Sequence, residues 1–427
     1  MLSFAEWDVK LIPYAVFIVV FITHVRSPVT TASDSRWFLP VAASILSHGD
    51  PDISEYSERM HEDGYVPLVG VDGGLYNHFP VGTPLMSLPL VFGINAYMNL
   101  FKGVSLEEYL RRNPAEGMER LIASFFVAVA AVFVFLFARR FAGAVEEALF
   151  AAFVFGFCTS AWSTASRALW QHGPVVLLLS VSVHLLLLAE KREAAVRYLF
   201  PVLAMVWIVR PTGLLPGVFL GAAALLKYPR SSLRGILFSL PIPILFMAHN
   251  LGAFGSFLPP YYHPMRMSFG AFFPEALAAS LFSPNRGLFV NSPILLMAFY
   301  GGWLLIRRKR FGLLEAALAA SIFTHWIAIS AIPHWWGGHS IGPRLFTDMV
   351  PFLVYFIVPA AAEVRCAGGI RRGVIVVSLI VLSSVSFFIH FRGSCDPRVL
   401  EWNRVPACVD SSPGRVWDWK DVHFLRW

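Results

Sequence analysis

Long apolar runs alternate with short polar connectors along nearly the whole chain. Runs of about 17–22 apolar residues recur, and a helix of that length crosses the roughly 30 Å hydrocarbon layer of a bilayer. The pattern predicts an all-α polytopic membrane protein with about eleven transmembrane helices. We expect these spans at residues 9–25, 119–138, 146–164, 171–189, 195–210, 213–227, 235–252, 287–306, 312–332, 345–362 and 373–391.

One further apolar stretch, Pro84 to Phe101, is not counted as a span. Its interior Pro89 disfavours a straight spanning helix, and a crossing here would move every later basic cluster to the opposite side of the membrane. We interpret the stretch as a helix that lies in, or dips into, the interface. It belongs to a large first outer loop, residues 26–118, in which Trp37 to Leu46 also predicts an interfacial helix.

The distribution of charge predicts the orientation. Only 14% of residues are charged and 56% are hydrophobic, whereas a soluble domain is about a quarter charged. The excess of Lys and Arg gives a formal net charge of +7. Basic clusters at 139–140, 191–192, 227–234, 307–310 and 365–372 all fall in loops on one side, which the positive-inside rule makes cytoplasmic. Topology explains the positive charge, so we expect no nucleic-acid partner.

This orientation predicts a multi-pass protein of a bacterial inner membrane, with a cytoplasmic N-terminus. The first span is expected to remain as an anchor, since no small-residue cleavage site follows it. We divide the chain into a membrane module, residues 1–392, and a short extracytoplasmic tail, residues 393–427. Cys395 and Cys408 lie in that tail, where an oxidising compartment favours a disulfide between them. Two unpaired thiols are the alternative.

Polar groups at membrane depth are costly, so they tend to mark a cavity or a site. Here they gather at the predicted outer ends of the spans, which indicates one outward-facing cavity. Asp34, directly after the first span, is the centre of this set. It is either a charge that flanks or caps a helix, or a general base that takes a proton from an acceptor hydroxyl.

Four arginines share that side, namely Arg210, Arg266, Arg286 and Arg344. Each one alone could pair with a lipid phosphate or a nearby acid, and Asp348 stands four residues after Arg344 on the same predicted helix. Together they suit a phosphate or diphosphate group, which forked guanidinium donors recognise. We therefore predict that these arginines bind the phosphate of a donor.

Aromatic and histidine side chains complete the predicted lining of the cavity. Tryptophans there serve as interfacial belt residues or stack on a sugar face. The histidine spacings match no strong metal motif, so no metal ligand is assigned. Gly337, Gly338 and Gly342 predict an unusual backbone path nearby. The predicted substrate-lining residues are His78, Trp170, His172, His249, Tyr261, His263, Trp336 and His339.

Several short strings carry a resemblance to a known family. They are Ser33–Trp37, Phe79–Leu85, Leu169–His172, Arg210–Thr212, Arg286–Leu288 and Trp336–Arg344. In this order and on one side of the membrane, they resemble the GT-C superfamily of membrane glycosyltransferases. That group includes the protein O-mannosyltransferases, the aminoarabinose transferase of lipid A and the mycobacterial arabinofuranosyltransferases.

The resemblance implies a GT-C-like bundle and a polyprenyl-phosphate-linked sugar donor. It also implies an extracytoplasmic acceptor, which could be a glycan, a glycolipid or a protein, and a catalytic acid at Asp34. Many members have two acids close together in this loop, whereas Ser35 and Arg36 follow Asp34 here. This departure puts a bound divalent metal in doubt, and the chain also lacks the sizeable C-terminal domain of several relatives.

The resulting hypothesis is an inverting glycosyltransferase with Asp34 as general base. A transporter or flippase of a lipid-linked sugar is the first alternative. It would need polar groups through the bilayer, and the inner halves of the spans are almost purely apolar. A polymerase or ligase of lipid-linked glycans is the second alternative, although such enzymes tend to centre on a large late outer loop.

Overall fold

The computed structural model describes residues 8–31, 35–263 and 267–426, and the regular secondary structure of this part is almost entirely helical. The predicted all-α class is therefore confirmed. The helices are α1 Asp8–Arg26, α2 Phe38–His48, α3 Ser57–Glu62, α4 Gly82–Lys102, α5 Leu106–Arg112, α6 Glu116–Ala142, α7 Val145–Phe157, α8 His172–Ala189, α9 Leu199–Val209, α10 Leu214–Lys227, α11 Pro229–Ser239, α12 Pro241–Phe254, α13 Phe273–Phe282, α14 Leu288–Asn291, α15 Met297–Arg307, α16 Leu313–Ser330, α17 Val350–Cys366, α18 Gly369–Cys395 and α19 Pro397–Glu401. Two short antiparallel strands, β1 Leu68–Val69 and β2 Leu75–Tyr76, form the sheet in the described residues.

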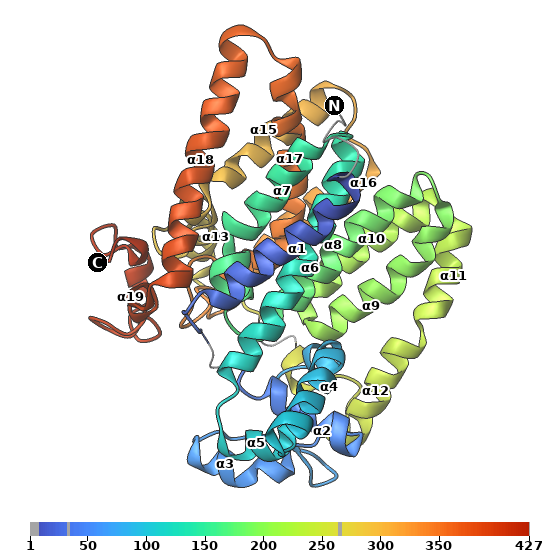
Figure 1. Ribbon diagram of the computed structural model, residues 1–427, viewed down its shortest axis with the longest axis vertical. Coiled ribbons are helices and arrows are strands. Elements are labelled where there is room, and N and C mark those ends of the chain that lie inside the picture. The colour runs from blue at the N-terminus through green and yellow to red at the C-terminus, as the bar shows by residue number, and fades with distance from the viewer. Residues whose placement is uncertain (1–7, 32–34, 264–266, 427) are drawn as a thin grey trace.

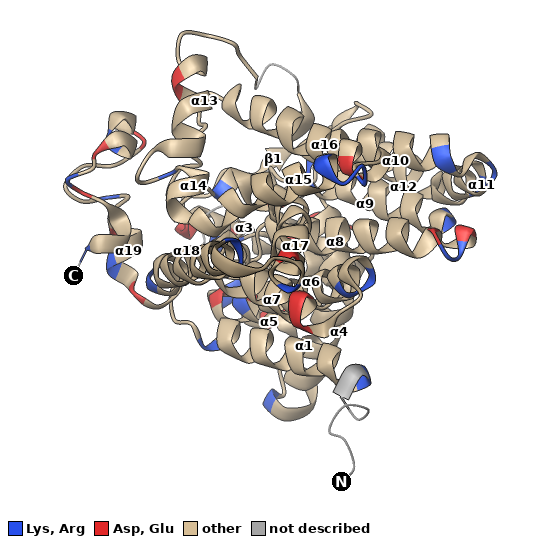
Figure 2. Ribbon diagram, turned by 90° about the horizontal axis from the view of Figure 1, so that it is seen from above, with Lys and Arg blue, Asp and Glu red and all other residues tan. Residues whose placement is uncertain are grey.

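Seven helical stretches of the described chain are long and apolar enough to cross a membrane. They are Gly82–Lys102, Glu116–Ala142, His172–Ala189, Pro229–Phe254, Leu313–Ser330, Arg344–Cys366 and Gly369–Cys395. Each of the eleven predicted ranges contains helix, but the count of eleven spans and their orientation stay predictions. Figure 2 shows long helical stretches without charge, with most of the coloured residues near turns and helix ends. A membrane protein is the class that this pattern supports.

The main core lies where α6 packs against α1, α7 and α8, and where α15 packs against α17 (Figure 1). Small residues let these helices approach closely. At Gly301 on α15, an added Cβ would lie only 1.8 Å from the carbonyl oxygen of Phe356 on α17. Helix association within a bilayer depends on such close packing, because lipid tails are as apolar as the side chains they would replace.

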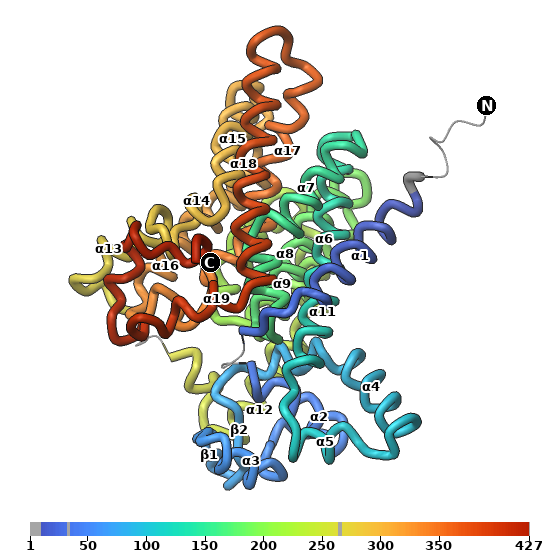
Figure 3. The backbone as a smooth tube through the Cα atoms, turned by 60° about the vertical axis from the view of Figure 1, so that its left-hand side comes forward, coloured from blue at the N-terminus to red at the C-terminus, as the bar shows by residue number. Residues whose placement is uncertain are grey.

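The first loop forms a separate layer at one end of the bundle, and we call this end the first-loop end (Figures 1 and 3). The layer contains α2, α3, α4, α5 and the two strands, and its own apolar core includes Trp37, Tyr56 and Leu110. Helix α4 lies beside α2 and α5 within this layer. It is also long enough to span a bilayer, so its predicted interfacial position stays a prediction.

Regular α-helix gives way to tighter or wider turns at several points. A π-helical segment, η2 (Ala161–Ala165), follows α7, and 3₁₀ segments precede α9, α10, α15 and α17: η3 (Glu193–Tyr198), η4 (Pro211–Gly213), η7 (Pro293–Leu296) and η8 (Arg344–Met349). Such irregular backbone is tolerated at membrane depth where it is buried in protein or lines a cavity, and π-bulges are frequent at functional sites. Of these segments, η4 directly follows Arg210 and η8 carries Arg344, so both lie at arginines that the sequence predicts for a site.

The predicted disulfide between Cys395 and Cys408 is not formed in the structure. Both cysteines are free thiols, and they lie in different surroundings. Cys395 ends α18, where its thiol is hydrogen-bonded to Ser27. The chain then turns through α19 and carries Cys408 to the loop before α17. There the Cys408 sulfur lies 3.3 Å from Nε2 of His339.

Candidate functional site

The centre of the candidate site is a buried ion-pair cluster built from three helical segments. His172 begins α8, Arg210 follows α9, and Asp348 lies in η8. Nδ1 of His172 is 2.6 Å from one oxygen of Asp348, and Nε of Arg210 is 3.0 Å from the other. One Nη of Arg210 also lies 3.4 Å from Nε2 of His172. All three side chains are buried, so the cluster fixes the relative positions of α8, α9 and η8.

Arg344 extends this cluster toward the surface. Its guanidinium carbon lies 3.6 Å from the ring centroid of Trp170, a close cation–π contact. The same guanidinium donates a hydrogen bond to the carbonyl oxygen of Gly337. Gly337 has a φ of 77°, a left-handed conformation that glycine adopts without strain. The predicted unusual backbone path is confirmed here, and it turns the loop carbonyl toward Arg344.

The first loop enters the same region through Ser35. The Ser35 hydroxyl donates to Oε2 of Glu119 at 2.5 Å, and this oxygen also accepts from the backbone N–H of Leu169 at 3.4 Å. Leu169 precedes Trp170, which carries Arg344 on its face. Ser35, Glu119 and Leu169 are all buried. A continuous series of contacts thus connects the loop start to the arginine cluster. Asp34 itself lies outside the described residues, as does Arg266.

Other predicted lining residues lie apart from this cluster, in the first-loop layer and beside it. The ring centroids of His249 and Tyr76 are 6.0 Å apart, and those of Tyr261 and Phe79 are 5.1 Å apart. Tyr76, Phe79 and His249 line a small pocket together with residues of α2 and α12. His78 contacts the carbonyl oxygen of Val66, and His263 is exposed.

The Tyr76 hydroxyl donates to Asp72 at 2.7 Å. That hydrogen bond lowers the pKa of the Asp72 carboxyl. His78, His249 and Tyr261 thus form a group of their own in and beside the first-loop layer.

Arg286 occupies a third place, beneath the tail. Its guanidinium donates to the carbonyl oxygens of Trp336, Asn285 and Gly338 and to the side chain of Asn403. Four of the five N–H groups of this guanidinium are thereby used, and the side chain is only 2% exposed. The contacts of Arg286 hold the loop to the tail, so the predicted phosphate-binding role is not what this geometry favours.

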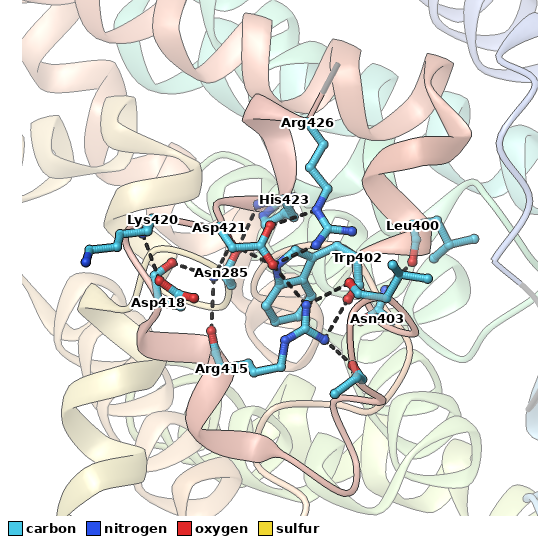
Figure 4. A network of polar contacts seen from close by, with 12 residues as sticks. Asn285, Leu400, Trp402, Asn403, Arg415, Asp418, Lys420, Asp421, His423 and Arg426 are labelled. Atoms are coloured by element: carbon cyan, nitrogen blue, oxygen red, sulfur yellow. Dashed lines mark hydrogen bonds and ion pairs between the residues drawn. The ribbon is translucent and has the colours of Figure 1, made fainter.

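A polar network joins the tail to Asn285, the residue before Arg286 (Figure 4). The Asn285 amide donates to three tail carbonyl groups, and Asp421 accepts from both Arg415 and Arg426. Burial would raise the pKa of Asp421, but the hydrogen bonds and charges of Arg426 and Arg415 outweigh it and lower that pKa. The Trp402 indole nitrogen donates to the backbone of Asp421. The short tail is therefore a folded cover of the loop before α17.

Two hollows are lined by neighbouring residues of η8. An open cavity of about 420 Å³ is lined by Arg344 together with His334, His339 and Asp410. An apolar groove of about 530 Å³ is lined by residues of α13 to α17, with Phe346 of η8 among them. Phe346 also lines a small pocket that contains Arg286, Trp336 and Arg344. The segment η8 therefore contributes to a polar cavity through Arg344 and to an apolar groove through Phe346.

Sequence reasoning missed three acids that organise this region. The sequence suggests Asp348 only as a local partner of Arg344, yet it pairs with Arg210 and His172 from distant helices. Glu119 is buried beside Ser35, and Asp410 accepts a hydrogen bond from the Trp336 indole nitrogen at 2.8 Å. The position of Glu119 at the outer end of a predicted span was the one available signal. Nothing local marks Asp348 or Asp410, because their partners are distant in sequence.

Of the predicted site residues, the structure joins Trp170, His172, Arg210 and Arg344 in one cluster. It also places Trp336 and His339 together around Asp410. No protein-family model matches the sequence, and a search of curated proteins also finds no match. The site geometry must therefore carry the functional argument.

Proposed function

We propose that the chain is a membrane glycosyltransferase that moves a sugar from a polyprenyl-phosphate donor to an acceptor hydroxyl. The observation that carries the proposal is that η8 lines the open cavity through Arg344 and the apolar groove through the nearby Phe346. A lipid-linked sugar has three parts: an apolar chain, an anionic phosphate and a polar sugar. An apolar groove, a cationic side chain and an open polar cavity match those parts in that order.

The phosphate is assigned to Arg344, with the buried Arg210 behind it. Because Arg210 already pairs with Asp348, we assign it a supporting role, as a fixed positive charge behind Arg344. Arg344 lines both the cavity and the pocket that shares Phe346 with the groove. A guanidinium suits the charge that develops on a leaving phosphate, and preorganised donors at such a place contribute strongly to catalysis.

Asp34 is assigned as the general base. It directly precedes Ser35, and the contacts of Ser35 lead through Glu119 and Leu169 to Trp170 and Arg344. In the proposed reaction, Asp34 takes the proton of the acceptor hydroxyl. The oxygen attacks the anomeric carbon in line, and the bond from that carbon to the phosphate oxygen breaks. The polyprenyl phosphate leaves with the electron pair, and a single displacement inverts the anomeric centre.

Trp170 is less available for stacking on a sugar, because the guanidinium of Arg344 occupies one face of its ring. Trp336, which lines the small pocket beside Arg344, is the better aromatic candidate for sugar stacking. The acceptor and the identity of the sugar are left open by this assignment. An extracytoplasmic location and the GT-C likeness belong to the same proposal.

The direct test uses full-length protein in detergent with a panel of synthetic polyprenyl-phosphate sugars. Sugar release and the lipid-phosphate product are both followed for the wild type, for Asp34→Asn and for a control in the same loop, Asp50→Asn. We expect one donor to be turned over by the wild type and the control, and not by Asp34→Asn. Near-normal transfer by Asp34→Asn would refute its role. Transport of an intact donor across vesicles, without cleavage, would favour the flippase instead.

A further inference from the structure

We propose that the loop before α17 and the C-terminal tail together bind a zinc ion, through His339, Cys408 and Asp410. These residues come from two segments that are about seventy positions apart. Their ligand atoms nevertheless lie within 4.8 Å of one another. The ion takes no part in the proposed transfer reaction, so the zinc site and that reaction can be tested separately.

The distances between the ligand atoms fit a tetrahedral zinc site. Nε2 of His339 lies 3.3 Å from the Cys408 sulfur and 3.5 Å from an oxygen of Asp410. Zinc bonds sulfur at about 2.3 Å and nitrogen or oxygen at about 2.0–2.1 Å. Tetrahedral angles then place sulfur and nitrogen about 3.5 Å apart and nitrogen and oxygen about 3.3 Å apart. The observed separations differ from these values by only a few tenths of an ångström.

The chemistry of the ligands also favours zinc. A thiolate with an imidazole and a carboxylate is a mixed set that suits zinc better than magnesium or calcium, which prefer oxygen ligands. The thiolate and the carboxylate together balance the two positive charges of the ion. His334, whose Nε2 is 3.6 Å from Asp410, or a water molecule from the open cavity would complete four ligands.

The surroundings hold the ligands in place. The Trp336 indole nitrogen donates to Oδ1 of Asp410 at 2.8 Å, while Oδ2 of the same carboxylate faces His339. Such outer contacts orient metal ligands in known sites. Gly337 and Gly338 adopt positive φ values and form the turn that brings His339 toward the tail. The ion would therefore fasten the tail to the loop before α17, in the cavity that Arg344 also lines.

The described residues contain a second group whose ligand atoms lie equally close together, His48, Glu55 and Glu107. This group fits an ion less well. Ser44 already donates to Glu55, and Arg111 forms an ion pair with Glu107 at 2.6 Å. The nearby guanidinium would repel a cation, and the group has no sulfur. This contrast makes the group a useful internal control.

The test measures zinc directly on tag-free, full-length protein in detergent. The protein is stripped with a chelator, loaded with zinc chloride, desalted and analysed for metal. We expect about one zinc per wild-type chain and at least a tenfold lower content in Cys408→Ser and His339→Ala. The matched controls Cys395→Ser and His48→Ala should bind as the wild type does. Equal zinc in Cys408→Ser, or none in the wild type, would overturn the proposal.

A second measurement covers the case in which a variant fails to fold, because it uses only the wild type. Alkylation of each cysteine is followed by mass spectrometry with and without zinc. Zinc should protect Cys408 strongly while leaving the exposed Cys366 equally reactive, and a chelator should restore the reaction. A disulfide between Cys395 and Cys408 in the purified protein, or unchanged alkylation of Cys408, would contradict the site.

Discussion

The ion pairs around Asp348, at the first-loop end, differ in burial from those around Glu363 and Glu147, at the opposite end. At the first-loop end, the side chains of His172, Arg210 and Asp348 are 0%, 7% and 2% exposed. At the opposite end, Glu363 and Glu147 are equally buried, but the arginines that pair with them are 40–51% exposed. The cluster around Asp348 buries both partners of each pair, whereas the pairs around Glu363 and Glu147 bury only the acid.

This difference shows which ion pairs lose hydration free energy when the protein folds. An arginine that keeps contact with solvent or headgroups loses little hydration, so the pairs around Glu363 and Glu147 serve as ordinary anchors. A fully buried pair loses the hydration of both charges, and hydrophobic residues in its place are often no less stable. Among the described residues, His172, Arg210 and Asp348 form such a buried group near the cavity that Arg344 lines, which is consistent with a site there.

The largest expected effect comes from removing the shared acid of the buried cluster. Asp348→Asn leaves Arg210 charged, buried and without its carboxylate, which costs about 3–5 kcal/mol of stability. Thermal unfolding in detergent should show a clearly lower midpoint than the wild type. An unchanged midpoint would mean that the cluster is hydrated, and the contrast between the two ends would disappear.

An intermediate effect is expected from pH, through the buried His423 of the tail. Burial, followed by the charge of Arg286, holds the pKa of His423 well below its usual value. The folded protein therefore binds fewer protons at this site than the unfolded chain does. Stability is complete above the unfolded pKa of about 6.5 and falls below it, by up to about 1.4 kcal/mol per pH unit.

His423→Gln should flatten that dependence. Midpoints measured from pH 7.5 to pH 5 would show the wild type losing stability faster than the variant. Equal slopes for the two proteins would mean that His423 does not sense the buried environment of the tail. Like the cluster around Asp348, the tail therefore buries an arginine and a histidine, namely Arg286 and His423.

The smallest effect is expected at the opposite end. Glu363→Gln removes the carboxylate that Arg308 and Arg371 share, but both arginines stay largely exposed. Such pairs contribute no more than about 1 kcal/mol, so the midpoint should move far less than in Asp348→Asn. A loss as large as that of Asp348→Asn would show that the two ends are equivalent.

The sequence predicted the helices better than the contacts between them. Apolar runs mark helices because each run must hide its backbone polar groups within itself, and all eleven ranges contain helix. The gathering of His172, Arg210 and Arg344 also followed from their shared position at span ends. The roles of Asp348 and Asp410 did not, since each depends on residues that are distant in sequence. The absent disulfide is a similar case, because only the folded tail separates Cys395 from Cys408.

The most direct measurement of the central claim compares one arginine from each end during donor cleavage. Release of polyprenyl phosphate is measured for the wild type, Arg344→Ala and Arg308→Ala, with each protein first checked for an unchanged unfolding midpoint. Because Arg344 is assigned to the leaving phosphate, its loss should slow release by about a hundredfold or more, while Arg308→Ala should remain close to the wild type. Equal rates for the two variants would contradict a phosphate site at the first-loop end.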